Sequence, residues 1–263
     1  MKKALAEIKA ELEHASENEW EPLILQYADD ERRGVQNLLL RFRKKQEELQ
    51  KERDRVESLC VYEKKYSQYS CICGIDEVGR GPLAGPVVAG AVILPANCRI
   101  LYVNDSKKLS EKKREELYDV IMEQALAVGI GYASPARIDE INILQATYEA
   151  MRQAIRKLAV KPEILLNDAV KIPGVDLPQV PIIKGDAKCQ SIAAASIVAK
   201  VTRDRLMVEY DKIMPEYGFA SNKGYGAQAH IEALKKYGPS PIHRKTFITH
   251  FVPSEVSESG SAV

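Results

Sequence analysis

Apolar and polar positions along the central part of the chain predict strands and helices in succession. Short apolar runs that favour strands lie at residues 72–78, 87–94, 125–133, 164–166 and 180–183. Apolar residues at helical spacing, with capping or stop residues at their ends, predict helices at residues 110–121, 135–157, 190–214 and 227–237. A short turn containing glycine and proline joins the first two strands and favours a hairpin. Strands interleaved with helices indicate an α/β fold with a central sheet.

The first 70 residues show a different pattern, with 29 charged side chains and a single proline, Pro22. Apolar positions at residues 5–12 and 35–42 predict two helices, divided by Pro22, with Gly34 before the second. Because their apolar faces are thin, we expect these helices to pack on the main domain or on a partner. The pattern therefore predicts three parts, which are a helical N-terminal extension (1–70), a main domain (71–250) and a flexible serine-rich tail (251–263).

Composition and charge exclude several classes of protein. No apolar run approaches the roughly 20 residues of a membrane helix, and the first residues become acidic before an apolar segment forms, unlike a secretory signal. We therefore expect a cytoplasmic protein with no membrane segment. The five cysteines show no metal-site spacing beyond the pair Cys71 and Cys73, and they are interpreted as core residues rather than ligands. The net charge of +1 gives no overall nucleic-acid signature. Residues 41–65 carry nine basic against six acidic side chains, which is either a phosphate contact or a solvated helix face.

Carboxylates recur where three predicted strands end: Asp76 with Glu77, then Asp168, then Asp186. The carboxyl ends of strands in an α/β sheet form its usual ligand crevice, so neighbouring strands would bring the four acids together. Such a cluster repels itself unless hard divalent cations neutralise it, and oxygen ligands favour magnesium or manganese over zinc. Each acid alone is also explained as a solvated loop residue, and Asp186 as a cap of the following helix.

A glycine-bracketed arginine, Gly79-Arg80-Gly81, follows the first pair of acids. Glycine has no β-carbon, so a ligand can come close to the backbone on either side of Arg80. An anion-binding loop would then lie beside a cation-binding pair. The alternative is a tight turn with solvated charges.

The stretch GIDEVGRGP at residues 74–82 resembles the signature of type 2 ribonuclease H, ribonuclease HII. The likeness covers roughly residues 71–250 and continues through DSKKL at 105–109, LNDA at 166–169, KGD at 184–186, residues 192–205, KGYG at 223–226 and SPIHR at 240–244. Ala227 follows the KGYG motif where the family commonly has threonine.

The resemblance implies a ribonuclease H-like fold, with a central mixed five-stranded sheet flanked by helices. It also implies an endonuclease that cleaves RNA in RNA–DNA hybrids and 5′ to single ribonucleotides embedded in duplex DNA, leaving 5′-phosphate and 3′-hydroxyl ends. Two divalent ions, Mn²⁺ or Mg²⁺, would activate water and stabilise the leaving oxygen.

Site residues carried over by motif are Asp76, Glu77, Asp168 and Asp186 as catalytic metal ligands, Gly79, Arg80 and Gly81 as readers of the ribose 2′-hydroxyl, and Tyr225 as the ring that stacks on the next, deoxy, sugar. Lys184 lies next to the metal ligands in the sequence and is either a phosphate contact or simply an exposed lysine. Asp204 competes with Asp186 for the fourth metal position. We prefer Asp186, because Asp204 lies eighteen residues further on, about 27 Å along a straight helix.

Other basic residues that could follow the duplex backbone are Lys107, Lys108, Lys200, Arg203, Arg244 and Lys245.

Two rival functions remain open. Type 3 ribonuclease H shares the fold and the metal chemistry but typically has another residue in place of Arg80. A non-catalytic nucleic-acid-binding module would gain nothing from four acids beside phosphates. A nucleotide-hydrolysing phosphate loop is excluded, because its glycine-lysine pattern does not occur near these glycines.

Overall fold

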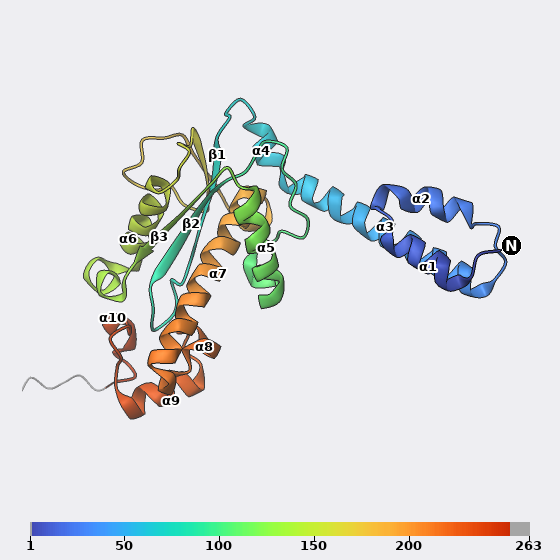
Figure 1. Cartoon of the computed structure of the whole chain (residues 1–263). Coiled ribbons are helices and arrows are strands. Elements are labelled where there is room, and N and C mark those ends of the chain that lie inside the picture. The colour runs from blue at the N-terminus through green and yellow to red at the C-terminus, as the bar shows by residue number, and fades with distance from the viewer. Residues whose placement is uncertain (1, 253–263) are drawn as a thin grey trace, which may run out of the picture. The chain divides into compact units, whose positions relative to one another are not determined.

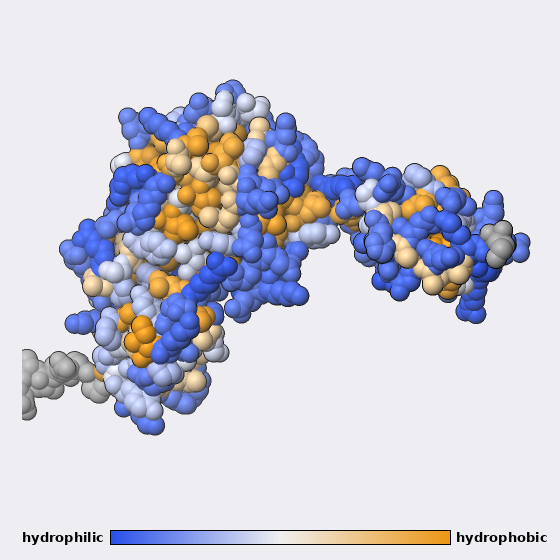
Figure 2. Space-filling model, in the orientation of Figure 1, coloured by the Kyte–Doolittle hydropathy of each residue, from blue (hydrophilic) through white to orange (hydrophobic). Residues whose placement is uncertain are grey.

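The computed structural model describes residues 2–252. The chain divides into two compact units, Met1–Ser58 and Leu59–Val263 (Figure 1). The predicted tail at 251–263 therefore lies almost entirely outside the described residues. On the face shown in Figure 2, hydrophilic side chains predominate on each unit, and apolar patches are scattered among them on that unit's surface. None of the helices in residues 2–252 is long and apolar enough to cross a membrane.

The first unit has a small core of its own. It is formed by α1 (Leu5–His14), α2 (Glu17–Gln26) and all but the last residue of α3 (Arg33–Leu59). The buried residues are Ile8, Leu12, Trp20, Ile24, Val35, Leu38, Leu39 and Phe42. The rings of Trp20 and Phe42 meet edge to face with centroids 5.6 Å apart. The thin apolar faces predicted from the sequence thus bury one another within the unit.

Pro22 lies inside α2, so the prediction that it separates two helices is wrong. An interior proline costs a helix about 3 kcal/mol, because it lacks a backbone N–H and crowds the preceding turn. Trp20 and Ile24 on either side are buried, and burial of about 1.5–3 kcal/mol for each large apolar side chain offsets that cost. Gly34 also lies within a helix, α3, rather than before it.

The second unit is built on a mixed five-stranded sheet, as the sequence predicts. Its strands are β1 (Ile72–Val78), β2 (Val87–Ile93), β3 (Ala127–Ala133), β4 (Ile164–Asp168) and β5 (Gln179–Ile182), in the order β3-β2-β1-β4-β5. β1 pairs antiparallel with β2, which confirms the predicted hairpin, and parallel with β4. The sheet therefore places the ends of β1 and β4 side by side.

Helices cover both faces of this sheet (Figure 1). α6 (Pro135–Arg156) packs on the face of the sheet that bears Ile75 and Leu165. α5 (Glu111–Gln124) and α7 (Gln190–Ile213) pack on the opposite face. α7 approaches β1 so closely that a Cβ on Gly74 would lie only 2.1 Å from the carbonyl carbon of Ser191. Glycine at this position therefore allows backbone-to-backbone contact between helix and strand.

Two helix caps predicted from the sequence are present. The hydroxyl of Ser110 accepts a hydrogen bond from Lys113 N at the start of α5. α6 contains a kink at Asn142, where φ is 65°, and the Asn142 side chain accepts bonds from the next turn, at Leu144 N and Gln145 N. The remaining helices are α4 (Val61–Lys65), η1 (Ser106–Lys108), η2 (Gly185–Ala187), η3 (Pro215–Tyr217), α8 (Phe219–Asn222), α9 (Gln228–Tyr237) and α10 (Lys245–Ile248).

Candidate active site

A cleft of about 820 Å³ lies at the carboxyl end of β1. Its walls come from β1 and the following loop, η1, α6, α7, α10 and the turn after α8. The lining residues are Asp76, Glu77, Val78, Gly79, Arg80, Gly81, Ser106, Lys107, Ile143, Ser196, Lys200, Tyr225 and Phe247. The cleft thus brings the first acid pair, the Gly79–Gly81 loop and Tyr225 to one place, although they are far apart in the sequence.

Strand register places Asp168 beside Asp76. Ile75 on β1 is paired with Asn167 on β4, and each aspartate is the next residue along its parallel strand. Side chains alternate between faces along a strand, so Asp76 points to the same face as Gly74, the face covered by α7. Two carboxylates therefore meet under α7 at the carboxyl ends of neighbouring strands.

Asp76 and Glu77 lie inside β1 rather than at its end, which corrects the expectation that these carboxylates mark the end of the strand. β1 continues to Val78 and stays paired with β2 to that point, and only its pairing with β4 stops at Ile75. The open β4 side allows both carboxylates to line one cleft although they start from opposite faces of the strand.

Burial and mutual repulsion perturb the two acids of β1. The pKa of Asp76 lies well above its usual value because the carboxyl is buried and faces the charges of Glu77 and Asp168. Hydrogen bonds from Ser196 and from Glu77 N offset part of this effect. Burial also raises the pKa of Glu77, against the opposing attraction of Arg80, whose Nη1 lies 3.2 Å from Glu77 Oε1. This pattern is typical of a catalytic or metal-binding site.

Asp186 is not at the end of a strand, so that prediction is wrong. β5 ends at Ile182, and Asp186 lies in η2. It does not cap the following helix either, because the N-cap residue of α7 is Cys189. Asp168, the last residue of β4, is linked to η2, since its Oδ1 accepts a hydrogen bond of 2.7 Å from Gly185 N.

Asp105 is an acid that sequence reasoning did not single out. It is the N-cap of η1, where its Oδ1 accepts a hydrogen bond from Lys107 N. Burial and the charges of Asp105 and Asp168 raise the pKa of Asp186. The signal for Asp105 was its place in the DSKKL stretch.

The donor set suits a hard divalent cation. All four predicted ligands are carboxylates, and Asp168 repels each of the other three electrostatically. Among residues 2–252, no three histidine, cysteine or acidic side chains already surround one point as metal ligands do. The acids are thus close enough to repel one another but do not yet form a closed coordination shell.

Comparison with known proteins decides the family. The protein-family model described as ribonuclease HII matches residues 73–250 of the sequence, and the family model described as the ribonuclease HII N-terminal domain matches residues 4–67. This chain belongs to the ribonuclease HII family. A ribonuclease HII of Lachnoclostridium phytofermentans is 67% identical over 244 residues, which covers 93% of this chain and 96% of the relative. One of Clostridioides difficile is 51% identical over 252 residues, covering 95% and 99%.

Solved structures agree with this assignment. The ribonuclease H2 of Pyrococcus horikoshii superposes with a TM-score of 0.57 at 29% identity, covering 67% of this chain and 93% of that one. The ribonuclease HII of Archaeoglobus fulgidus, solved in complex with PCNA, gives 0.57 at 28% identity, covering 68% and 96%. A ribonuclease HIII solved with Mn²⁺ gives 0.53 at 16% identity, which shows the shared fold alone.

The family expected from the sequence is therefore confirmed. Ribonuclease HII is the type 2 ribonuclease H, so the chain is a metal-dependent endonuclease of that class.

In this ribonuclease HII, Arg244 holds the glycine loop from inside the protein. Its guanidinium is completely buried and donates hydrogen bonds to the carbonyl oxygens of Gly79, Arg80 and Gly85. The prediction that Arg244 follows the duplex backbone is wrong, because the side chain does not reach the surface. Burial lowers its pKa to about 9, and the repulsion of Arg203 acts in the same direction.

Arg203 is the second buried guanidinium, and the same correction applies to it. It donates to the carbonyl oxygens of Pro86, Lys223 and Ala84 at 2.8–3.0 Å. Gly79 has a φ of +85°, and a Cβ there would lie 2.3 Å from Arg203 Nε. Only glycine therefore fits at position 79 of the loop, beside this guanidinium.

Tyr225 projects from a turn that is tied to the same loop. Its side chain is 41% exposed and lines the cleft. The preceding residue, Gly224, accepts a backbone hydrogen bond of 2.8 Å from Leu83 N. The guanidinium carbon of Arg203 lies 5.9 Å from the ring centroid, within cation–π range. The loop and the ring are therefore parts of one hydrogen-bonded assembly.

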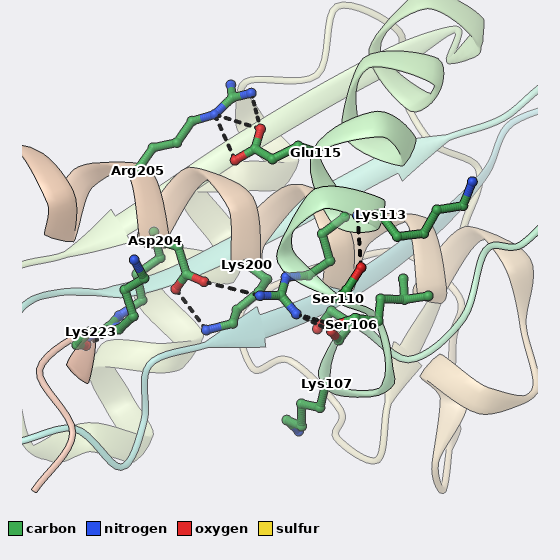
Figure 3. Close-up of polar contacts among 12 residues, drawn as sticks. Ser106, Lys107, Ser110, Lys113, Glu115, Lys200, Asp204, Arg205 and Lys223 are labelled. Atoms are coloured by element: carbon green, nitrogen blue, oxygen red, sulfur yellow. Dashed lines mark hydrogen bonds and ion pairs between the residues drawn. The ribbon is translucent and has the colours of Figure 1, made fainter. Parts of the chain in front are cut away.

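Asp204 is neutralised by cations on α7 and α5. Lys200 Nζ lies 2.7 Å from its Oδ1, and Arg114 lies 3.8 Å from its Oδ2 (Figure 3). Lys200 also lines the cleft. Asp204 thus belongs to an ion-pair network, unlike the acids near Asp76, which repel one another.

Two other lysines differ in their relation to the acids. Lys184 is exposed and adopts the left-handed conformation just before η2. Lys107 lines the cleft and acts electrostatically on Glu77 and on Asp186. Lys107 is therefore a cleft cation that the sequence pointed to only as a possible contact of the duplex backbone.

Proposed function

We propose that this ribonuclease HII cleaves RNA within RNA–DNA hybrids and nicks duplex DNA 5′ to a single ribonucleotide. The observation that carries the proposal is the meeting of Asp76, Glu77 and Asp168 beside the Gly79–Gly81 loop and Tyr225. A metal-dependent nuclease needs anionic ligands at the scissile phosphate, and a ribonucleotide-specific one also needs groups that recognise a 2′-hydroxyl.

Asp76, Glu77, Asp168 and Asp186 are the residues we propose as ligands of Mg²⁺ or Mn²⁺. The chemistry that such ions supply is activation of water and stabilisation of negative charge on the leaving oxygen. The raised pKa values of Asp76 and Glu77 support the assignment, because a bound cation would offset the burial, and the smaller repulsion among the carboxylates, that raise them.

The loop residues Gly79, Arg80 and Gly81 are proposed to recognise the ribose 2′-hydroxyl. A 2′-hydroxyl both donates and accepts hydrogen bonds, so fixed backbone groups can distinguish it from hydrogen. Arg244 fixes the orientation of the Gly79 and Arg80 carbonyls. A Cβ on Gly81 would meet nothing within 4 Å, so this position is open to an approaching sugar.

Tyr225 is proposed to stack on the deoxyribose of the next nucleotide, where a 2′-hydroxyl would weaken the apolar contact. Lys107 lies in the cleft, and Lys184 is near the acids in sequence, so both are proposed as phosphate contacts. Catalysis is assigned to residues 71–250, with residues 1–70 as an accessory extension and 251–263 as a tail. Because the proposed substrate is nucleic acid, we also propose a cytoplasmic location.

A cleavage assay tests this function. The substrate is a labelled DNA duplex with one ribonucleotide, incubated with enzyme and either Mg²⁺ or Mn²⁺. We expect one nick on the 5′ side of the ribonucleotide, and we expect Asp76→Asn to bind the duplex without cutting it. Intact substrate under both ions would favour a non-catalytic binding module. Cutting restricted to runs of several ribonucleotides would favour type 3 specificity.

A further inference from the structure

Two histidines are buried against each other behind Tyr225. His230 in α9 is 0% exposed and His243 is 4% exposed, and their Nε2 atoms lie 3.0 Å apart. The aromatic rings of Tyr217 and Phe219 surround them, with centroids 5.0–6.4 Å from the imidazoles. Neither histidine lines the cleft.

Hydrogen-bond geometry fixes which nitrogen of each ring carries a proton. Ser240 N donates to His243 Nδ1 at 2.9 Å, so that nitrogen carries no proton and the proton of the ring lies on Nε2. This Nε2–H can donate only to an unprotonated His230 Nε2. The proton of His230 therefore lies on Nδ1, 2.8 Å from the carbonyl oxygen of Tyr225. The chain of donors runs from Ser240 through both rings to Tyr225.

This chain requires two neutral imidazoles. A second proton on His230 would place two N–H groups face to face at the Nε2 contact, and one on His243 would oppose the N–H of Ser240. Burial lowers the pKa of both rings, that of His243 to about 4. The titratable neighbour Tyr217 donates its hydroxyl to Gly238 O and so offers neither ring a carboxylate-like partner.

The histidine pair also adjoins the glycine loop. His243 forms an isolated β-bridge with Ala84, and Gly85 N donates to Ile242 O at 2.9 Å. Ala84 and Gly85 end the loop that begins at Gly79. One side of the pair is thus fixed to this loop, and the other side holds the carbonyl of Tyr225.

We propose that His230 and His243 are positioning residues that hold the Tyr225 ring at the cleft and thereby set the preference for a deoxynucleotide after the ribonucleotide. This inference rests on the role proposed above for Tyr225. The Tyr225 carbonyl accepts from His230 Nδ1 and from Ala227 N at 2.8 Å each. Loss of the histidine donor removes one of these two restraints on the peptide group, and the ring shifts with it.

A matched pair of variants at His230 separates positioning from packing. Asparagine places its amide N–H near Nδ1 and retains the donor to Tyr225, whereas glutamine places its amide near Nε2 and loses that donor. The readout is the ratio of kcat/KM on a ribonucleotide–deoxynucleotide junction to that on a junction of two ribonucleotides. Because both values come from one enzyme preparation, the fraction of folded protein cancels.

His230→Gln should lower this ratio by about five- to tenfold, the effect of one lost hydrogen bond, and His230→Asn should keep it within about twofold. Equal ratios for the two variants would overturn the proposal. Tyr225→Ala, measured in parallel, gives the ratio without the ring. An unchanged ratio in Tyr225→Ala refutes the role of the ring itself, whereas a drop there with equal His230 variants refutes only the histidine pair.

Nitrogen-15 NMR of the histidine rings tests the proton arrangement without any activity measurement. At neutral pH we expect His230 protonated on Nδ1 and His243 on Nε2, with signals assigned by single His→Asn variants. Neither ring should become an imidazolium as the pH is lowered to about 6, below the usual histidine pKa of about 6.5. An Nε2–H tautomer for His230, or a charged ring at neutral pH, would contradict the inference.

Discussion

Replacing Arg244 by lysine is expected to destabilise the second unit strongly. The guanidinium makes four hydrogen bonds to three carbonyls, those of Gly79, Arg80 and Gly85. Lysine keeps the charge but lacks the planar fork of donors, so an ammonium that reaches one carbonyl leaves two without a partner. Each buried carbonyl without a donor costs about 1–3 kcal/mol, which gives a loss of about 2–6 kcal/mol. Typical domains have about 5–15 kcal/mol of stability in total.

Urea denaturation followed by far-UV circular dichroism measures this loss. The single tryptophan, Trp20, lies in the first unit, so its fluorescence reports that unit separately. Arg205→Lys is the matched control, because that guanidinium is half exposed and pairs with Glu115 at the surface, where an ion pair contributes about 0–1 kcal/mol. If Arg244→Lys costs no more than this control, the argument that buried carbonyls depend on Arg244 is refuted.

Three further changes have defined outcomes. Gly74→Ala places a Cβ 2.1 Å from the Ser191 carbonyl carbon and should cost about 1–3 kcal/mol in urea denaturation; an unchanged midpoint would contradict the close packing of α7 on β1. Asp76→Asn should stabilise the metal-free enzyme in thermal melts at neutral pH. The Asp76 carboxyl has a raised pKa in the folded protein and binds its proton more tightly there than in the unfolded chain, so the wild-type protein loses folding stability as the pH rises above about 4. This gain in stability should vanish as the pH falls toward 4. If the variant is less stable than the wild type in the presence of a chelator, the inference that burial and neighbouring charges make the Asp76 carboxylate unfavourable is refuted. Ala227→Thr should add a side-chain acceptor at the N-cap of α9 and raise stability by about 1 kcal/mol, or Tm by about 2–4 °C; a lowered Tm would contradict this.

Elements with strong local signals were predictable from the sequence. The hairpin of β1 and β2 follows from two apolar runs joined by a short turn, and the caps at Ser110 and Asn142 follow from the chemistry of their side chains. Pro22 was misplaced because packing around it outweighs its intrinsic helix penalty. Asp186 was misplaced because the apolar run before it continues past the end of β5, so the strand end was set one residue too late and the η2 turn was not foreseen.

The interior of the site was less predictable than its acids. Asp76 and Asp168 follow apolar runs, so their meeting could be deduced once the two strands were taken as neighbours. Arg203 and Arg244 were interpreted as surface cations, because arginine is almost never buried without an acidic partner. Here backbone carbonyls from distant segments replace that partner, and no local sequence signal shows such a tertiary arrangement.

Anomalous diffraction from crystals of the enzyme soaked in Mn²⁺ would locate the metal directly. We expect the strongest anomalous peak to lie against Asp76 together with at least one of Glu77, Asp168 and Asp186, and to be lost in Asp76→Asn. Manganese bound elsewhere while these carboxylates hold none, at a concentration that supports cleavage, would contradict the account.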